Sequence, residues 1–209
     1  MAISLSHVFY EFVTLFVILD PVATIPIFLL VTNGLDRRQS LWVAAYALGV
    51  AFLVLLFFII GGQLLLDALR IPVPSFQLAG SLVLLLFGLK MVLGKITEEA
   101  ASLPSGATLL ERAVYPLAIP CIAGPGSMLT VVVLTDANVR TMAEQATTTG
   151  VLLLCLAGFF LLYAFASLIF RVLGRSGSEI VSRVFGLILA SIAVNGLIIA
   201  IKLSFALPK

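Results

Sequence analysis

The sequence predicts an all-α membrane protein whose six transmembrane helices form two inverted three-helix repeats. Three observations predict this fold: the hydropathy of the chain, the spacing of its charged residues, and two similar proline-containing segments. Of the 209 residues, 62% are hydrophobic and 11% are charged, and the mean hydropathy is +1.24. Soluble domains carry roughly 25% charged residues, so this chain has too little charge to cover a surface exposed to water. A lipid bilayer is the solvent that such a composition requires.

The charged residues separate long apolar stretches. The first stretch, 12–35, contains a single charge, Asp20. Five others contain none: 39–66, 71–89, 113–135, 145–170 and 184–201. A helix needs about 20 apolar residues to cross the hydrocarbon core, whereas barrel strands alternate over about 10 residues. The stretches do not alternate, and they predict six helices: 8–30, 41–63, 74–93, 114–135, 149–170 and 181–203.

The longest polar stretch, 94–113, divides the chain into two halves. We interpret it as a cytoplasmic linker between a first three-helix repeat, 1–93, and a second repeat, 114–209. Each half has an odd number of spans, so the second half would insert in the opposite orientation. Cytoplasmic connections are enriched in Lys and Arg, and the connections on the linker side carry twice as many of them as the other side. Both termini are therefore expected outside the cytoplasm.

Each half begins with a helix that prolines interrupt. The interrupted runs are LDPVATIP (19–26) and PCIAGPGS (120–127). Proline inside a helix removes a backbone donor and costs about 3 kcal/mol or more, and in lipid the released carbonyl groups cannot turn to water. Asp before Pro is a helix-start signal, and Gly-Pro-Gly places a proline in the same way beside a flexible joint. We therefore predict that the first and fourth helices are each broken near the membrane midplane.

The two breaks together predict a binding site. A half-helix N-terminus carries unsatisfied N–H groups and the positive end of a dipole, which suits a small anionic group such as a carboxylate. Interrupted helices in corresponding positions of inverted repeats are typical of transporters. The candidate substrate-binding residues are Asp20, Pro21, Thr24, Pro26, Ala123, Gly124, Pro125, Gly126, Ser127 and Asn195. Asp20 and Thr24 are also candidates for binding a coupling ion.

Some of these polar residues have a structural interpretation too. Asp20, an acid well inside a predicted span, caps the second half-helix or binds an ion or a proton, and the two roles are compatible. Thr24 and Ser127 bind a ligand or satisfy a released carbonyl. Asn195 faces the site or holds two helices together.

Two features outside the breaks carry structural expectations. Glu11 lies at the edge of the first span and is expected in solvent. Gly186 with Ala190, and Ala45 with Gly49, have the small-xxx-small spacing that favours close helix packing.

The sequence argues against catalysis, metal binding and nucleic-acid binding. The single histidine, His7, precedes the first helix, so Ser127 lacks the usual base of a serine nucleophile. Cys121 and Cys155 lie in apolar stretches and predict neither a disulfide framework nor a metal cluster. The net charge of +2 is too small for a nucleic-acid surface. We expect no enzyme and no cofactor.

The two interrupted runs resemble the signatures of a known family. Residues 16–28 (FVILDPVATIPIF) look like the opening signature of the MarC/SnatA family, and residues 115–127 (YPLAIPCIAGPGS) look like a second one. Length, six spans and a central polar loop also match, so the resemblance covers essentially the whole chain. It implies an inner-membrane protein, and better-characterised members are similar to transporters of small neutral amino acids, such as glycine and alanine, driven by an ion gradient. The family commonly has Asn where this chain has Asp20, and often Arg where it has Gln77.

The residues and the resemblance together favour a secondary transporter in the plasma (inner) membrane. We expect it to move a small neutral amino acid by alternating access around the midplane site, with H⁺ or Na⁺ as the coupling ion. Its expected partners are that substrate and the lipid bilayer, and an oligomer stays open. Two alternatives also stay open: a small-solute channel whose half-helix caps resemble those of aquaporins, and a membrane accessory protein that does not transport.

Overall fold

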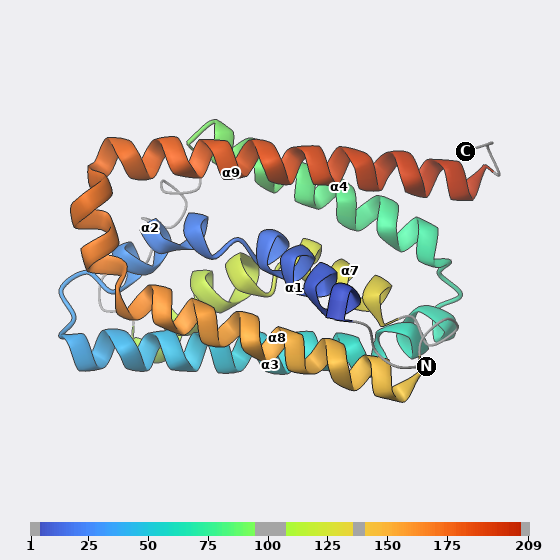
Figure 1. Ribbon diagram of the computed structural model, residues 1–209, viewed down its shortest axis with the longest axis horizontal. Helices are drawn as coiled ribbons and strands as arrows, with labels where there is room; N and C mark the ends of the chain where they lie inside the picture. Colours follow the sequence, from blue (N-terminus) through green and yellow to red (C-terminus); the bar gives the residue numbers. More distant parts are fainter. Residues whose placement is uncertain (1–4, 95–107, 136–140, 206–209) are drawn as a thin grey trace.

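The computed structural model describes residues 5–94, 108–135 and 141–205, and within these residues all regular structure is helical. The first half contains α1 (Leu5–Leu19), α2 (Pro21–Val31), α3 (Arg37–Ala68) and α4 (Val73–Val92). The second half contains α6 (Leu109–Arg112), η1 (Ala113–Ile122), α7 (Pro125–Leu134), α8 (Met142–Ala164) and α9 (Ala166–Ser204). Most of these helices run along the long axis of the molecule (Figure 1). Most of the predicted linker, 95–107, lies outside the described residues.

Four of the described helices are long and apolar enough to cross a membrane: α3, α4, α8 and the Arg183–Ser204 part of α9. A fifth span is formed if Leu109–Ile122 and Gly126–Leu134, which are bent by 57° relative to each other, count as one. The predicted first span, 8–30, is divided between α1, with 15 residues, and α2, with 11 residues. Neither helix is long enough to cross a bilayer alone.

Both predicted breaks are present. Asp20 separates α1 from α2, and Ala123 and Gly124 separate η1 from α7. Pro21 and Pro125 each occupy the first position of the following helix, where a proline loses no hydrogen bond. The breaks therefore lie where the prolines predicted them.

The segment before the second break is less regular than the predicted half-helix. Within η1, Tyr115 and Ile119 have extended backbone angles, and both precede a proline in a cis peptide bond. The physical reason is steric, because the ring of a proline disfavours the α-conformation of the residue before it. Two prolines four residues apart therefore prevent a regular helix over 113–122.

Several helix ends differ from the apolar boundaries. The predicted fifth helix, 149–170, is wrong in register, since α8 begins at Met142 and ends at Ala164, and α9 begins at Ala166. The earlier start has a local cause: Thr141 and Glu144 form a reciprocal capping box. The end at Phe165 has no proline or glycine signal. Hydropathy locates apolar stretches, whereas capping and packing decide where a helix ends.

The core draws on both halves. Buried side chains of α1, α2 and α3 join those of η1, α7 and α8 in one hydrophobic cluster, which includes Leu15, Leu55, Leu117 and Phe159. A smaller cluster joins α4 to α9. At this second contact a Cβ on Gly88 would lie 2.8 Å from the Gly186 carbonyl oxygen and 2.9 Å from the Ala190 nitrogen. The predicted small-residue packing is therefore confirmed for Gly186 and Ala190. It is wrong for Ala45 and Gly49, since both are exposed and no atom lies within 4 Å of a Cβ on Gly49.

Each element of the first half contacts its counterpart in the second. α3 packs on α8, α4 packs on α9, and the broken pair α1–α2 packs on η1–α7, with α1 beside α7 and α2 beside η1. The cross-contacts also match, since α9 contacts α2 while α4 contacts α7. In Figure 1, α3 runs from left to right and α8 from right to left, and the other pairs are likewise antiparallel.

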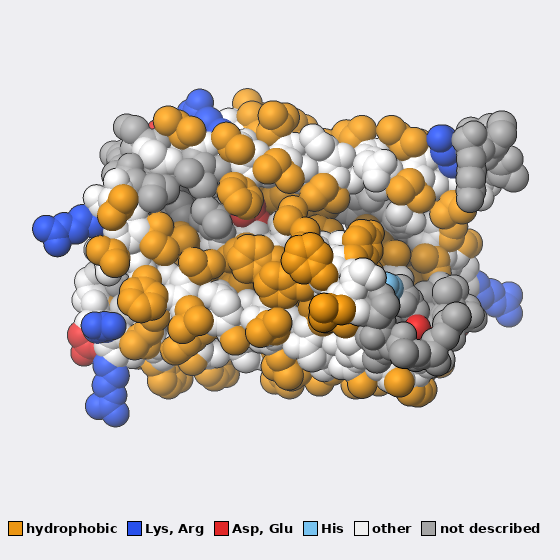
Figure 2. All heavy atoms as spheres, viewed as in Figure 1, with side chains coloured by type: hydrophobic (Ala, Val, Ile, Leu, Met, Phe, Trp, Pro, Cys, Tyr) orange, Lys and Arg blue, Asp and Glu red, His pale blue; other side chains and the backbone are white. Residues whose placement is uncertain are grey.

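The surface has the distribution expected of a membrane protein. Large apolar side chains are exposed along the helices, with Leu53 65%, Ile60 73% and Leu187 63% exposed. Apolar groups cover most of the face in Figure 2, while Lys and Arg side chains gather at the two ends. Apolar atoms on this scale would be unfavourable in water but suit a lipid surface.

Candidate functional site

Asp20 forms the first break through its backbone as well as its side chain. Its φ angle is 50°, in the left-handed region that Asp and Asn tolerate better than most non-glycine residues. The turn keeps helical bonds on both sides, because the Asp20 N–H donates to the Phe16 carbonyl and the Thr24 N–H donates to the Asp20 carbonyl. The residue is 2% exposed. A typical N-cap has an extended backbone, so Asp20 differs in conformation from the predicted cap.

Thr24 links the first break to α8. Its hydroxyl donates to the Pro21 carbonyl at 2.9 Å, and it accepts a hydrogen bond of 2.8 Å from the Tyr163 hydroxyl. The Tyr163 ring stacks on Phe28, with ring centroids 4.4 Å apart. Thr24 and Tyr163 are both 2% exposed. The Thr24 hydroxyl therefore bonds within α2, since the Pro21 carbonyl belongs to the first turn of that helix, and it also holds a tyrosine of the other half. The predicted role of Thr24 as a partner for a released carbonyl stays a prediction.

The second break combines a hydroxyl bond with close backbone packing. Ser127 donates to the Ile122 carbonyl at 2.8 Å, which replaces the helical bond lost at the break. A Cβ on Gly124 would collide with the Pro120 carbonyl oxygen, and one on Gly126 would lie 2.5 Å from Leu84 Cδ1. Space therefore requires glycine at position 124, where the neighbour is backbone, whereas at position 126 the neighbour is the end of the flexible Leu84 side chain.

The two breaks lie beside each other, because α1 packs on α7 and α2 packs on η1. Tyr163 of α8 joins the second half to the first break, since its hydroxyl donates to Thr24 of α2. Tyr163 was not among the predicted site residues, because tyrosines near the ends of spans usually mark the membrane interface. Its position inside a run without other polar groups was the only available signal.

The predicted site residues fall into three groups in the structure. Seven are buried around the two breaks: Asp20, Pro21, Thr24, Ala123, Gly124, Gly126 and Ser127. Asn195 is exposed on α9, so the structure does not bring it together with these seven. The side chains of Pro26 and Pro125 lie outside the described part of the structure.

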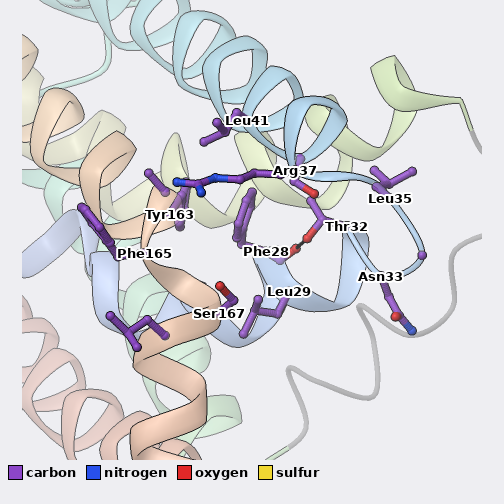
Figure 3. Close-up of a pocket in the computed structure, with 14 residues that line it drawn as sticks. Phe28, Leu29, Thr32, Asn33, Leu35, Arg37, Leu41, Tyr163, Phe165 and Ser167 are labelled. Carbon is purple, nitrogen blue, oxygen red and sulfur yellow. Dashed lines mark hydrogen bonds between the residues drawn. The ribbon is translucent and has the colours of Figure 1, made fainter.

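A pocket of about 600 Å³ opens beside this cluster. Its lining comes from α2, the α2–α3 turn, the start of α3, and the junction of α8 with α9, and includes Phe28, Thr32, Arg37, Tyr163 and Ser167. Figure 3 shows the Arg37 side chain pointing across the pocket towards Tyr163. The stacked rings of Phe28 and Tyr163 thus face the pocket, while the hydroxyl of Tyr163 faces Thr24.

The end of α2 at this pocket is fixed by the second half. The Arg112 guanidinium donates to the Val31 carbonyl at 2.8 Å. The last carbonyls of a helix carry the negative end of its dipole, so a cation there is stabilising. A residue next to the second broken segment therefore anchors the first one.

Glu11 corrects the expectation that it lies in solvent. It is 1% exposed, and its carboxylate lies 3.1 Å from His7 Nε2 and accepts a hydrogen bond of 3.0 Å from the Thr148 hydroxyl of α8. The expectation failed because α1 begins at Leu5 and turns this side chain towards α8. A second buried carboxylate therefore lies on the same helix that ends at Asp20.

An all-helical chain with four to five candidate spans, an apolar lateral surface and charged ends defines a multi-pass integral membrane protein. The chain belongs to the MarC family: the family described as MarC family integral membrane protein matches residues 5–205. The resemblance found in the sequence is therefore confirmed.

Similar proteins come from bacteria and archaea. A UPF0056 membrane protein of Aquifex aeolicus is 31% identical over 194 residues, which cover 91% of this chain and 90% of that protein. A UPF0056 membrane protein of Archaeoglobus fulgidus is 31% identical over 200 residues, with the same coverage. The UPF0056 inner membrane protein YhgN of Escherichia coli is 30% identical over 183 residues, covering 88% of this chain and 90% of YhgN. No solved structure matches this chain.

Proposed function

We propose that the protein is a secondary transporter that moves small neutral amino acids, such as glycine and alanine, across the cytoplasmic membrane. The observation that carries the proposal is the meeting of two helix breaks, with α1 packed on α7 and α2 packed on η1, and with Asp20 and Ser127 buried there. Discontinuous helices that meet inside a membrane protein are the usual structural basis of substrate and ion sites in secondary transporters. Transport would be driven by a proton or sodium gradient.

The proposed architecture is an inverted repeat. It is supported by the pairing of each element with its counterpart, by the matching contacts α2 with α9 and α7 with α4, and by the opposite direction of the paired segments (Figure 1). In an inverted repeat, exchanging the two halves exchanges the inward-facing and outward-facing forms. α1–α2 packs antiparallel on η1–α7. If the two halves exchange conformations, both breaks would change together.

The chemistry of the site favours a small zwitterion. The first turns of α2 and α7 offer N–H groups to a carboxylate, while the Asp20 carboxylate suits an ammonium group or a cation. Space at the second break is small, because Gly124 packs on the Pro120 carbonyl and Gly126 packs on Leu84. These contacts favour a substrate with a small side chain.

The pocket beside the cluster supplies an entrance. Arg37 at its rim would attract the carboxylate of a substrate, and the Phe28–Tyr163 stack would separate the pocket from Thr24 at the first break in this form of the protein. Alternating access then requires the rings of Phe28 and Tyr163 to separate when the site opens towards the pocket.

The proposal is tested with purified protein in liposomes. Uptake of radiolabelled glycine and alanine is measured with and without an imposed proton or sodium gradient. We expect gradient-driven accumulation in the wild type and its loss in Gly126→Leu. Gly49→Leu is the matched control, because Gly49 lies on α3 with open space around its Cβ position.

The alternatives give different results. A channel would equilibrate the amino acid across the membrane without accumulating it, and unlabelled substrate inside the liposomes would not stimulate the uptake of labelled substrate. An accessory protein would do neither. Failure of well-folded protein to move either amino acid under any gradient would reject the proposed substrates.

A further inference from the structure

We infer that Glu11, together with His7 and Thr148, forms a proton-binding site that couples substrate movement to a proton gradient. This inference rests on the proposed transport function and adds to it the residues that hold the coupling proton. It starts from a buried carboxylate that the substrate site does not use. Ionisable residues within membrane proteins are rare and are usually functional.

The Thr148 hydroxyl lies within hydrogen-bonding distance of two oxygen atoms. Its oxygen lies 3.0 Å from Glu11 Oε2 and 3.2 Å from the Glu144 carbonyl oxygen, yet a hydroxyl has one hydrogen to donate. When Glu11 is ionised, Thr148 donates to the carboxylate. When Glu11 is protonated, its O–H donates to Thr148, and Thr148 donates to the Glu144 carbonyl. Each charge state of Glu11 therefore keeps its hydrogen bond to Thr148.

The His7 side chain connects the surface of the protein to the buried Glu11. The His7 side chain is 32% exposed and lies 3.1 Å from Glu11 Oε1, whereas Glu11 is 1% exposed. The imidazole therefore lies between the surface and the buried carboxylate, within hydrogen-bonding distance of it, and offers a proton a path to Glu11. The N-terminal turns of α1 thus connect the surface to the buried acid.

Few other described titratable groups face Glu11. From α8, the Glu144 carboxylate bonds to the Thr141 cap, and the Cys155 thiol contacts the Phe12 carbonyl one residue along α1. α7, which also packs on α1, contains no ionisable residue. The side-chain contacts of Glu11 that the described structure gives are those with His7 and Thr148.

Glu11 lies on the face of α1 that leads to the first break. Glu11, Leu15 and Leu19 form the buried face of this helix, which contacts α8 and ends at the turn of Asp20. Glu11 and Asp20 are nine positions apart in the chain, which corresponds to about 13 Å along a helix. A change in the Glu11–Thr148 bond alters how α1 is held against α8, and α1 transmits this change to the first break.

The test separates proton binding from transport. Infrared titration of the protein in lipid should reveal the C=O band of a protonated carboxylic acid that disappears in Glu11→Gln and persists in Glu179→Gln, an exposed control. In liposomes, an inward gradient of about one pH unit supports about tenfold accumulation per coupled proton. We expect Glu11→Gln to lose this accumulation while it still exchanges internal for external substrate.

Thr148 distinguishes a proton site from a structural contact. Thr148→Val should shift the pH profile of exchange, and Thr148→Ser, which keeps the hydroxyl, should restore it. These variants also decide the question if Glu11→Gln does not fold. Retained proton-driven accumulation in Glu11→Gln, or an unchanged infrared band, would overturn the inference while transport stands. Absence of transport in the wild type would reject the proposed function and leave the infrared titration to decide on proton binding.

Discussion

The two helix breaks reach a similar result through different chemistry. At the first break one residue, Asp20, supplies both the left-handed turn and the buried charge. The second break contains no charged residue, and it is formed instead by prolines that disrupt η1, a glycine pressed against the Pro120 carbonyl, and a serine that satisfies the Ile122 carbonyl. The comparison teaches that an interrupted helix needs a local turn and a partner for each released carbonyl, and that several residue types can provide them.

The largest expected effect is at Gly124. Replacing it with alanine places a Cβ against a backbone oxygen, which cannot move aside as a flexible side chain can. We expect Gly124→Ala to destabilise the protein by about 3 kcal/mol, at the upper end of overpacking effects. The measurement is the thermal unfolding midpoint in detergent, with Gly150→Ala in open space on α8 as the control. Equal midpoints for the two variants would show that the second break can widen.

Ser127 should follow in size. Ser127→Ala removes the donor to the buried Ile122 carbonyl, and an unsatisfied buried group costs about 1–3 kcal/mol. Ser127→Thr, which keeps the hydroxyl, is the matched control. Thermal unfolding that is unchanged in Ser127→Ala would mean that this carbonyl finds another partner.

Asp20 should respond to two substitutions in different ways. Asp20→Ala should destabilise the protein by about 1–2 kcal/mol, because alanine tolerates the left-handed region poorly. Asp20→Asn should keep the stability of the wild type and change only transport or its ion dependence. Thermal unfolding and gradient-driven uptake, measured on both variants, separate the conformational from the electrostatic role. Equal stability of the two would remove the conformational role.

The smallest expected effect is at Tyr163. Tyr163→Phe keeps the stacking on Phe28 and removes the hydrogen bond to Thr24, so we expect a loss of about 1 kcal/mol. A double-mutant cycle with Thr24→Val measures the coupling between the two side chains. Additive effects would indicate that the bond does not hold the two halves together.

The sequence predicted the features that are local in the chain. Pro21 and Pro125 determine where the helices after the breaks begin, and the hydroxyl of Ser127 was recognised as a partner for a released carbonyl. These predictions depend on neighbours within five residues. The helical fold follows equally from apolar stretches whose length fits a membrane.

The features that were missed depend on distant contacts. Tyr163 reaches Thr24 across 139 positions in the chain, and Thr148 reaches Glu11 across 137. The helix end at Phe165 carries no local signal, and Asn195 looked suitable by residue type but is exposed on α9. Periodicity and composition predict which residues are helical but not which of them meet.

The bond from Arg112 to the last turn of α2 has a consequence for biosynthesis. A chain is made from its N-terminus, and domains generally fold as units. Here, however, the guanidinium that holds α2 is translated after α1 to α4, as are most of the side chains that complete their core. The first four helices therefore reach their native packing only after the second half of the chain has been synthesised.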